Sequence, residues 1–107
     1  MFAKQLHPIW RELLADQLEL LSEIEDRVNS DPLSIPVSDK ILRAFKLPPQ
    51  DYRVLIVGQD PYPNPDHATG LAFSVPSTVK KIPPTLKNIC KELESDIGFV
   101  PKSGDLS

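Results

Sequence analysis

The chain has 107 residues, 40% of them apolar and 25% charged, which is the composition of one ordinary globular domain. Its longest apolar run, Val54–Val57, is far too short to cross a bilayer, and the N-terminus has no signal-peptide core, so we expect a cytoplasmic protein with no membrane partner. The net charge of −3 argues weakly against nucleic acid, while the lone Cys90 suits a reducing compartment.

The first part of the chain is predicted to be helical. Apolar residues recur at helical spacing over residues 10–28, namely at Trp10, Leu13, Leu14, Leu18, Leu21 and Val28. Pro8 stands where a helix can begin, and Asn29-Ser30-Asp31-Pro32 ends it. A second, short helix is predicted over residues 38–45, with Ile41, Leu42 and Phe45 buried.

The middle of the chain is predicted to contain a strand. Residues 53–57 are β-branched and apolar almost without interruption, which is typical of a strand buried on both faces of a parallel sheet. The chain then turns at Gly58, and the prolines of residues 61–70 predict a loop. Residues 70–75 are interpreted as a short extended segment.

The clearest helix is predicted over residues 86–97, where Leu86, Ile89, Cys90, Leu93 and Ile97 form one apolar stripe. Thr85 is a candidate N-cap, and Gly98 a candidate left-handed residue after the helix. The elements together predict an α/β fold, a partial three-layer α/β/α structure with a parallel sheet whose strand lies between the 10–28 and 86–97 helices. One strand is too few for such a sheet, so residues 1–107 are expected to form the N-terminal part of a single domain.

Asp60 is the first candidate for chemistry. It follows the predicted strand, at the edge where open α/β sheets bind their ligands. Pro61 stiffens the turn, and Tyr62 and Phe73 offer aromatic faces that suit a planar ligand beside a developing positive charge. Each residue also has a structural interpretation, since Asp after Gly is common in turns and Phe73 in an apolar stretch is more often core.

The start of the last helix is a second candidate site, formed by Pro83, Pro84, Thr85, Lys80, Lys81 and Lys87. The first amides of a helix favour an anion. Residues 76–91 hold four lysines and no acid, so the local charge favours phosphate. The alternative is a solvated lysine face in which Thr85 is only a cap. No histidine has a partner at metal-ligand spacing, and neither a metal nor another cofactor is expected.

Three blocks, Val54–Tyr62, Gly70–Val75 and Ile82–Ile89, resemble the family-1 uracil-DNA glycosylases in order and spacing. Pro8–Leu14 and Ser103–Leu106 are also similar to that family. The resemblance covers nearly the whole chain, and its Gly-Gln-Asp-Pro-Tyr motif is highly specific. It implies a truncated uracil-DNA glycosylase fold with its C-terminal half missing. It also implies hydrolysis of the N-glycosidic bond of uracil in DNA during base-excision repair.

The resemblance implies a role for each matching residue. Asp60 would activate water and stabilise the sugar cation, and Gln59 would contact uracil, largely through its backbone. Tyr62 would fill the space that the methyl group of thymine needs, and Phe73 would stack on the flipped uracil. The DNA backbone would lie against Pro83, Pro84, Thr85, Lys80, Lys81 and Lys87. The expected partner is uracil-containing DNA, single- or double-stranded, and the complete protein is expected to be a monomer.

The chain also departs from the family pattern. Pro63 stands where His is common, as in actinobacterial-type members, and Thr85 stands where Ser is common. Family members continue with an Asn that reads uracil and a His-Pro-Ser-Pro segment, which are not present, so the isolated chain is expected to be weakly active or inactive. The alternative is a non-catalytic truncated remnant or an interaction module of the same fold. An unrelated nucleotide-binding α/β protein is less favoured because the glycines are not clustered.

Overall fold

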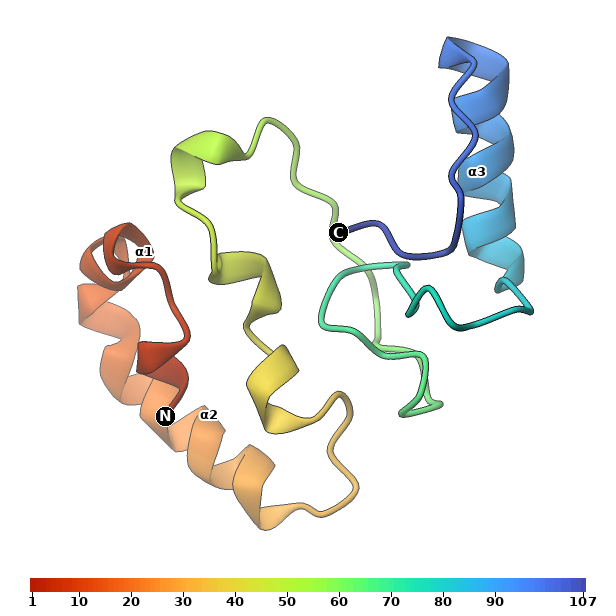
Figure 1. Ribbon diagram of the computed structural model, residues 1–107. Helices are drawn as coiled ribbons and strands as arrows, with labels where there is room; N and C mark the ends of the chain where they lie inside the picture. Colours follow the sequence, from red (N-terminus) through yellow and green to blue (C-terminus); the bar gives the residue numbers. More distant parts are fainter.

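The computed structural model describes all residues 1–107 and contains helices and connecting segments without a β-strand (Figure 1). Helices make up 45% of the chain. The α-helices are α1 (Pro8–Leu13), α2 (Leu18–Ser30) and α3 (Pro84–Ile97). Single turns of 3-10 helix occupy Phe2–Lys4, Ala15–Gln17, Ser38–Lys40, Arg43–Phe45 and Pro49–Asp51. None of the helices combines the length and the apolar character that crossing a bilayer requires.

The predicted helix over residues 10–28 is broken into α1, a 3-10 turn and α2. It begins at Pro8 and ends at Ser30, close to the predicted ends, and the side chain of His7 caps it by accepting a hydrogen bond from the amide of Ile9. The break changes the direction of the chain so that α2 packs against the turn Phe2–Lys4. There Glu25 accepts a hydrogen bond from the amide of Phe2 and pairs with the terminal amine. Helical spacing cannot reveal such a break, because the apolar positions continue through it.

The predicted helix over residues 38–45 is also wrong, because the segment forms two separate 3-10 turns. Its long-range contacts explain this shape. The carbonyl of Phe45 accepts a hydrogen bond from the amide of His7, and the Phe45 ring meets Trp10 edge-on at 5.2 Å. The indole of Trp10 donates to the carbonyl of Leu47 at 2.9 Å. These contacts attach the turns to α1 at the expense of a continuous helix.

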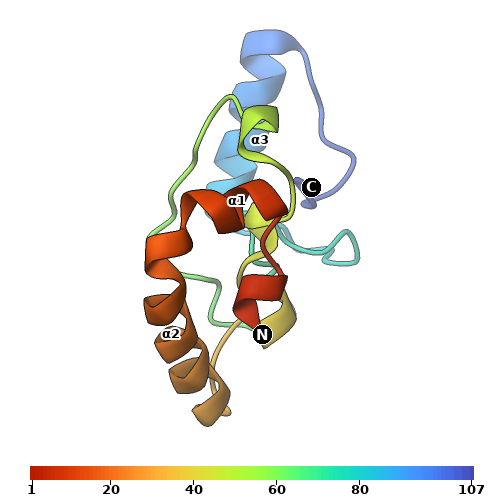
Figure 2. The same ribbon diagram turned by 90° about the vertical axis from the view of Figure 1, so that its left-hand side faces the viewer.

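The predicted parallel sheet is wrong. Val54–Val57 is extended, but its side chains are 63–86% exposed and its backbone forms no hydrogen bond with another residue. A strand exists only as one member of a hydrogen-bonded pair, and residues 70–75 form a turn that leaves Val54–Val57 without a neighbour. The helices expected to enclose the sheet do not face each other across it: α2 and α3 lie on opposite sides of the molecule in Figure 1 and one above the other in Figure 2.

The largest group of buried residues lies between α3, the turn of residues 68–75 and the C-terminal segment. Val75 and Leu86 are fully buried, and the amide of Val75 donates to the carbonyl of Gly104 at 2.9 Å. A β-carbon on Gly104 would collide with Val75, so only glycine fits at this crossing. The C-terminal segment therefore runs back along α3 towards the middle of the molecule (Figure 1).

Candidate functional site

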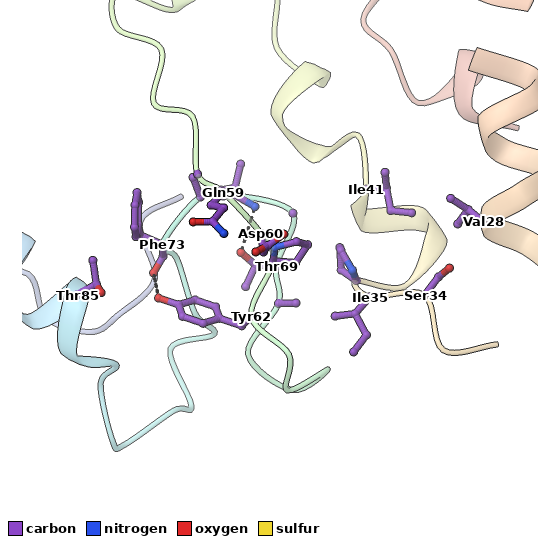
Figure 3. A pocket seen from close by; sticks show the side chains of 17 residues that line it. Val28, Ser34, Ile35, Ile41, Gln59, Asp60, Tyr62, Thr69, Phe73 and Thr85 are labelled. Atoms are coloured by element: carbon purple, nitrogen blue, oxygen red, sulfur yellow. Dashed lines mark hydrogen bonds between the residues drawn. The ribbon is translucent and has the colours of Figure 1, made fainter. Parts of the chain in front are cut away.

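A cleft of about 720 Å³ lies at the end of the exposed segment Val54–Val57. Its volume is in the range of small-molecule sites, about 300–1,000 Å³. Five of the residues singled out from the sequence line it together: Gln59, Asp60, Tyr62, Phe73 and Thr85. Figure 3 shows Phe73 and Thr85 at one end, Val28 and Ser34 at the other, and Asp60 between them. Residues that are up to 26 positions apart, from Gln59 to Thr85, thus share one cleft.

Asp60 reaches the cleft with its carboxylate unpaired. The residue is exposed, and the one ion pair of the chain joins the terminal amine to Glu25 and does not involve Asp60. No cationic side chain lines the cleft. The carboxylate therefore remains available to a water molecule or to a cation that develops on a bound ligand.

Two contacts hold Tyr62 in place. Its hydroxyl donates a hydrogen bond to the backbone carbonyl of Phe73 at 2.8 Å (Figure 3). Burial raises the pKa of the Tyr62 phenol, which extends to higher pH the range over which the oxygen keeps the donating proton. The ring also meets His67 edge-on, with the ring centroids 6.0 Å apart. Tyr62 is consequently a fixed wall of the cleft.

Phe73 adopts a backbone conformation that is rare for a large side chain. Its φ angle is +64°, in the left-handed region, which costs about 1–3 kcal/mol and persists only where the surroundings enforce it. The turn around it is closed by a hydrogen bond from the hydroxyl of Thr69 to the carbonyl of Ser74 at 3.3 Å. This turn places the half-buried Phe73 ring at the cleft.

Comparison with known proteins relates this chain to a family. No family model matches the chain. The uracil-DNA glycosylase of Mycobacteroides abscessus is 44% identical over 110 residues, which cover 98% of this chain and 49% of the relative. The uracil-DNA glycosylases of Campylobacter jejuni strain 81-176 and Thermobifida fusca are 43% and 39% identical and cover 92% and 97% of this chain.

The chain is a homologue of the uracil-DNA glycosylases. The resemblance predicted from the Gly58–Tyr62 motif is therefore confirmed. The chain spans about half the length of the curated relatives it matches, and corresponds to their N-terminal part.

The uracil-DNA glycosylase homologue positions its cleft with residues that the sequence analysis missed. Thr69 and Ser74, both buried, close the turn that carries Phe73, and the amide of Leu106 donates to the Ser74 hydroxyl at 2.9 Å. Gly70 has a φ of +81°, and a β-carbon there would collide with the carbonyl of Lys40. The pair Thr69-Gly70, a short hydroxyl residue before glycine, is a turn signal that predicts a local turn but not these long-range contacts.

The residues predicted to form a site at the start of α3 do not all line the same cleft. Thr85 lines the cleft but is not the N-cap, because Pro83 occupies that position and Pro84 begins the helix. Gly98, with φ +67°, ends α3 as predicted. Lys80 and Lys87 line a second cleft of about 410 Å³, together with two lysines that the sequence analysis did not select, Lys91 and Lys102. Pro83, Pro84 and Lys81 line neither cleft.

Proposed function

We propose that the chain supplies the uracil-binding and water-activating side of a uracil-DNA glycosylase, which hydrolyses the N-glycosidic bond between uracil and deoxyribose in DNA. The observation that carries this proposal is the meeting of Gln59, Asp60, Tyr62 and Phe73 in one cleft of a chain homologous to these enzymes. A single nucleotide turned out of the DNA stack brings a planar base and a sugar to such a cleft.

Asp60 is assigned to the chemical step. Its unpaired carboxylate accepts a proton from a water molecule while the water oxygen bonds to C1′ of the sugar. The bond from C1′ to N1 of uracil breaks, and its electron pair leaves with the base. A carboxylate also stabilises the positive charge that the sugar ring gains as that bond lengthens. The absence of any cation beside Asp60 leaves its full charge available for this purpose.

The base is assigned to the space between Phe73 and Tyr62. The half-buried Phe73 ring lines the cleft and offers a stacking face. The fixed Tyr62 ring opposes any group that projects from C5 of the pyrimidine, which separates uracil from thymine. Gln59 lies next to Asp60 and is assigned to the edge of the base. Pro83, Pro84 and Thr85 are assigned to the DNA backbone because they begin α3 where Thr85 reaches the cleft.

The experiment compares two proteins on a single-stranded oligonucleotide with one uracil. One is this chain, and the other is a fusion of this chain to the part of the Mycobacteroides abscessus relative that lies beyond the matched residues. We expect uracil release from the fusion and little or none from the chain alone. A folded fusion that binds the oligonucleotide but releases no uracil would instead support a non-catalytic interaction module.

Replacement of Asp60 by Asn in the fusion tests the assigned role. We expect single-turnover uracil release to fall by about 10²–10⁴-fold, the range for a positioned proton acceptor. Affinity for the oligonucleotide should change little, because phosphate contacts determine it. Glu12→Gln, an exposed carboxylate in α1, is the matched control. If Asp60→Asn weakens binding as much as the rate, the assignment is wrong.

A further inference from the structure

The second cleft gathers positive charge in a chain whose net charge is −3. Lys80 comes from the segment before α3, Lys87 and Lys91 from one face of α3, and Lys102 from the C-terminal segment that returns beside the helix. No acidic residue lines this cleft. Three separate stretches of the chain therefore bring four ammonium groups to one cleft of about 410 Å³.

None of these four lysines has a carboxylate partner. The one ion pair of the chain lies elsewhere, between the terminal amine and Glu25, and all four lysine side chains are exposed. An ordinary solvated lysine face usually alternates with acids that neutralise it. Like charges around one cleft without such acids repel one another, and an anion that enters the cleft relieves this repulsion.

The chemistry of the two clefts is complementary. The first contains the aromatic rings of Tyr62 and Phe73 and no lysine or arginine, whereas the second contains four lysines and no aromatic ring. Aromatic rings bind bases by stacking, and lysines bind phosphates as point charges without reading the base. The second cleft therefore suits a chain of phosphodiesters, and the first suits a single base.

The two clefts lie on either side of the beginning of α3. Thr85 lines the first cleft, while Ile82 and Lys87, three residues before it and two residues after it, line the second. Lys87 and Lys91 follow one another by one helical turn, about 6 Å along the helix axis. Because each helix residue turns the chain by about 100°, Thr85 and Lys87 lie on opposite sides of α3, and a strand that leaves the first cleft reaches the row of charges by passing over Pro83 and Pro84 at the beginning of the helix.

We propose that the second cleft binds the phosphodiester backbone of the DNA strand next to the nucleotide held in the first cleft, through Lys80, Lys87, Lys91 and Lys102. This inference rests on the proposed function for its choice of DNA as the polyanion. It assigns Lys91 and Lys102 to DNA binding and gives Lys81 no place in the cleft. The binding is independent of base sequence and of uracil.

The test measures binding of the chain to fluorescently labelled oligodeoxythymidine, which contains no uracil, over a series of salt concentrations. For single strands the slope of log K against log salt falls by about 0.7 for each phosphate contact removed. We expect the variant Lys91→Gln/Lys102→Gln to lose about 1.4 from this slope. The matched control Lys4→Gln/Lys46→Gln, two exposed lysines outside the cleft, should retain it. Equal slopes in the two variants would overturn the proposal.

A second measurement needs no substitution. We expect bound oligodeoxythymidine to protect Lys91 and Lys102 of the unmodified chain from acetylation, detected by mass spectrometry, and to leave Lys4 and Lys46 reactive. Unprotected cleft lysines would contradict the proposal. Equally tight binding of polyglutamate, with the same dependence on Lys91 and Lys102, would assign the cleft to an acidic peptide instead. These readouts involve neither uracil nor catalysis. They can therefore fail while the fusion releases uracil, and they can succeed while the fusion releases none.

Discussion

Two apolar segments of this chain, Val54–Val57 and the segment that ends at Val75, differ in what they contact. Val54–Val57 is 63–86% exposed and forms no backbone hydrogen bond, whereas Val75 is fully buried and bonded to Gly104. Both segments contain β-branched residues that favour extended structure. The difference is the presence of a partner, because the return of the C-terminal segment covers Val75 and nothing covers Val54–Val57. Apolar character alone does not bury a segment.

This difference divides the candidate site into a supported and an unsupported part. Phe73 belongs to the turn closed by Thr69 and Ser74. Asp60 follows the uncovered segment, and its side chain makes no hydrogen bond or ion pair that fixes it. The hydrogen bond from Tyr62 to the carbonyl of Phe73 joins the two parts.

Gly70→Ala should cause the largest loss of stability. Gly70 lies in the supported turn with φ +81°, and a β-carbon there would meet the backbone of Lys40. We expect a loss of about 2–5 kcal/mol from the left-handed conformation and the collision together, measured by urea unfolding followed by circular dichroism.

The control for this prediction is Gly98→Ala. Gly98 has φ +67°, close to that of Gly70, but a β-carbon there meets nothing within 4 Å. It should therefore lose only the conformational part, about 1–2 kcal/mol. Equal losses at the two glycines would mean that the contact with Lys40 does not support the turn.

Truncation of one valine in each segment tests the comparison directly. Val75→Ala should lower the free energy of unfolding by about 2 kcal/mol, because it removes buried methyl groups and leaves a cavity. Val57→Ala, at a residue 80% exposed, should change it by less than about 0.5 kcal/mol. The same urea titration measures both. A large loss at Val57 would indicate that this segment is covered in solution, for example by a second copy of the chain.

The sequence predicted local features better than features that depend on partners. The ends of α3 follow from Pro83-Pro84 and Gly98, which act on their own backbone, and were predicted closely. The sheet was wrongly predicted, because strand patterning at Val54–Val57 says nothing about whether another strand is present. The meeting of Asp60 with Tyr62 and Phe73 was predicted from the motif and its resemblance to a family.

The residues that the sequence could not reveal are those that act over long distances in the chain. Gly70 lies against the backbone of Lys40, and Ser74 accepts a hydrogen bond from the amide of Leu106; neither contact leaves a periodic pattern. Lys102 joins the lysine cleft only because the C-terminal segment turns back beside α3. Composition identified the four lysines of residues 76–91 but could not assign them to one surface.

A smaller effect on stability than at Gly70 or Val75 is expected at Tyr62, the link between the two parts. Tyr62→Phe removes the hydrogen bond to the carbonyl of Phe73 and retains the ring, so we expect a loss of about 1 kcal/mol in the free energy of unfolding. The bond should persist across neutral and moderately alkaline pH in the unsubstituted chain, because burial raises the pKa of the phenol. Urea unfolding of the two chains measures the difference.

Substitutions of Tyr62 also test whether its ring rejects thymine or only supports the turn of Phe73. A pocket that only fails to gain from an extra methyl group discriminates by about 1–3 kcal/mol, so strong rejection of thymine requires a collision with a fixed group. In the fusion described above, Tyr62→Ala removes the ring and should permit release of thymine from DNA, while uracil release falls moderately. Tyr62→Phe retains the ring and should still reject thymine. Rejection of thymine by both variants would show that Tyr62 only supports the turn of Phe73, and release of thymine by both would assign selectivity to the hydrogen bond that holds the ring.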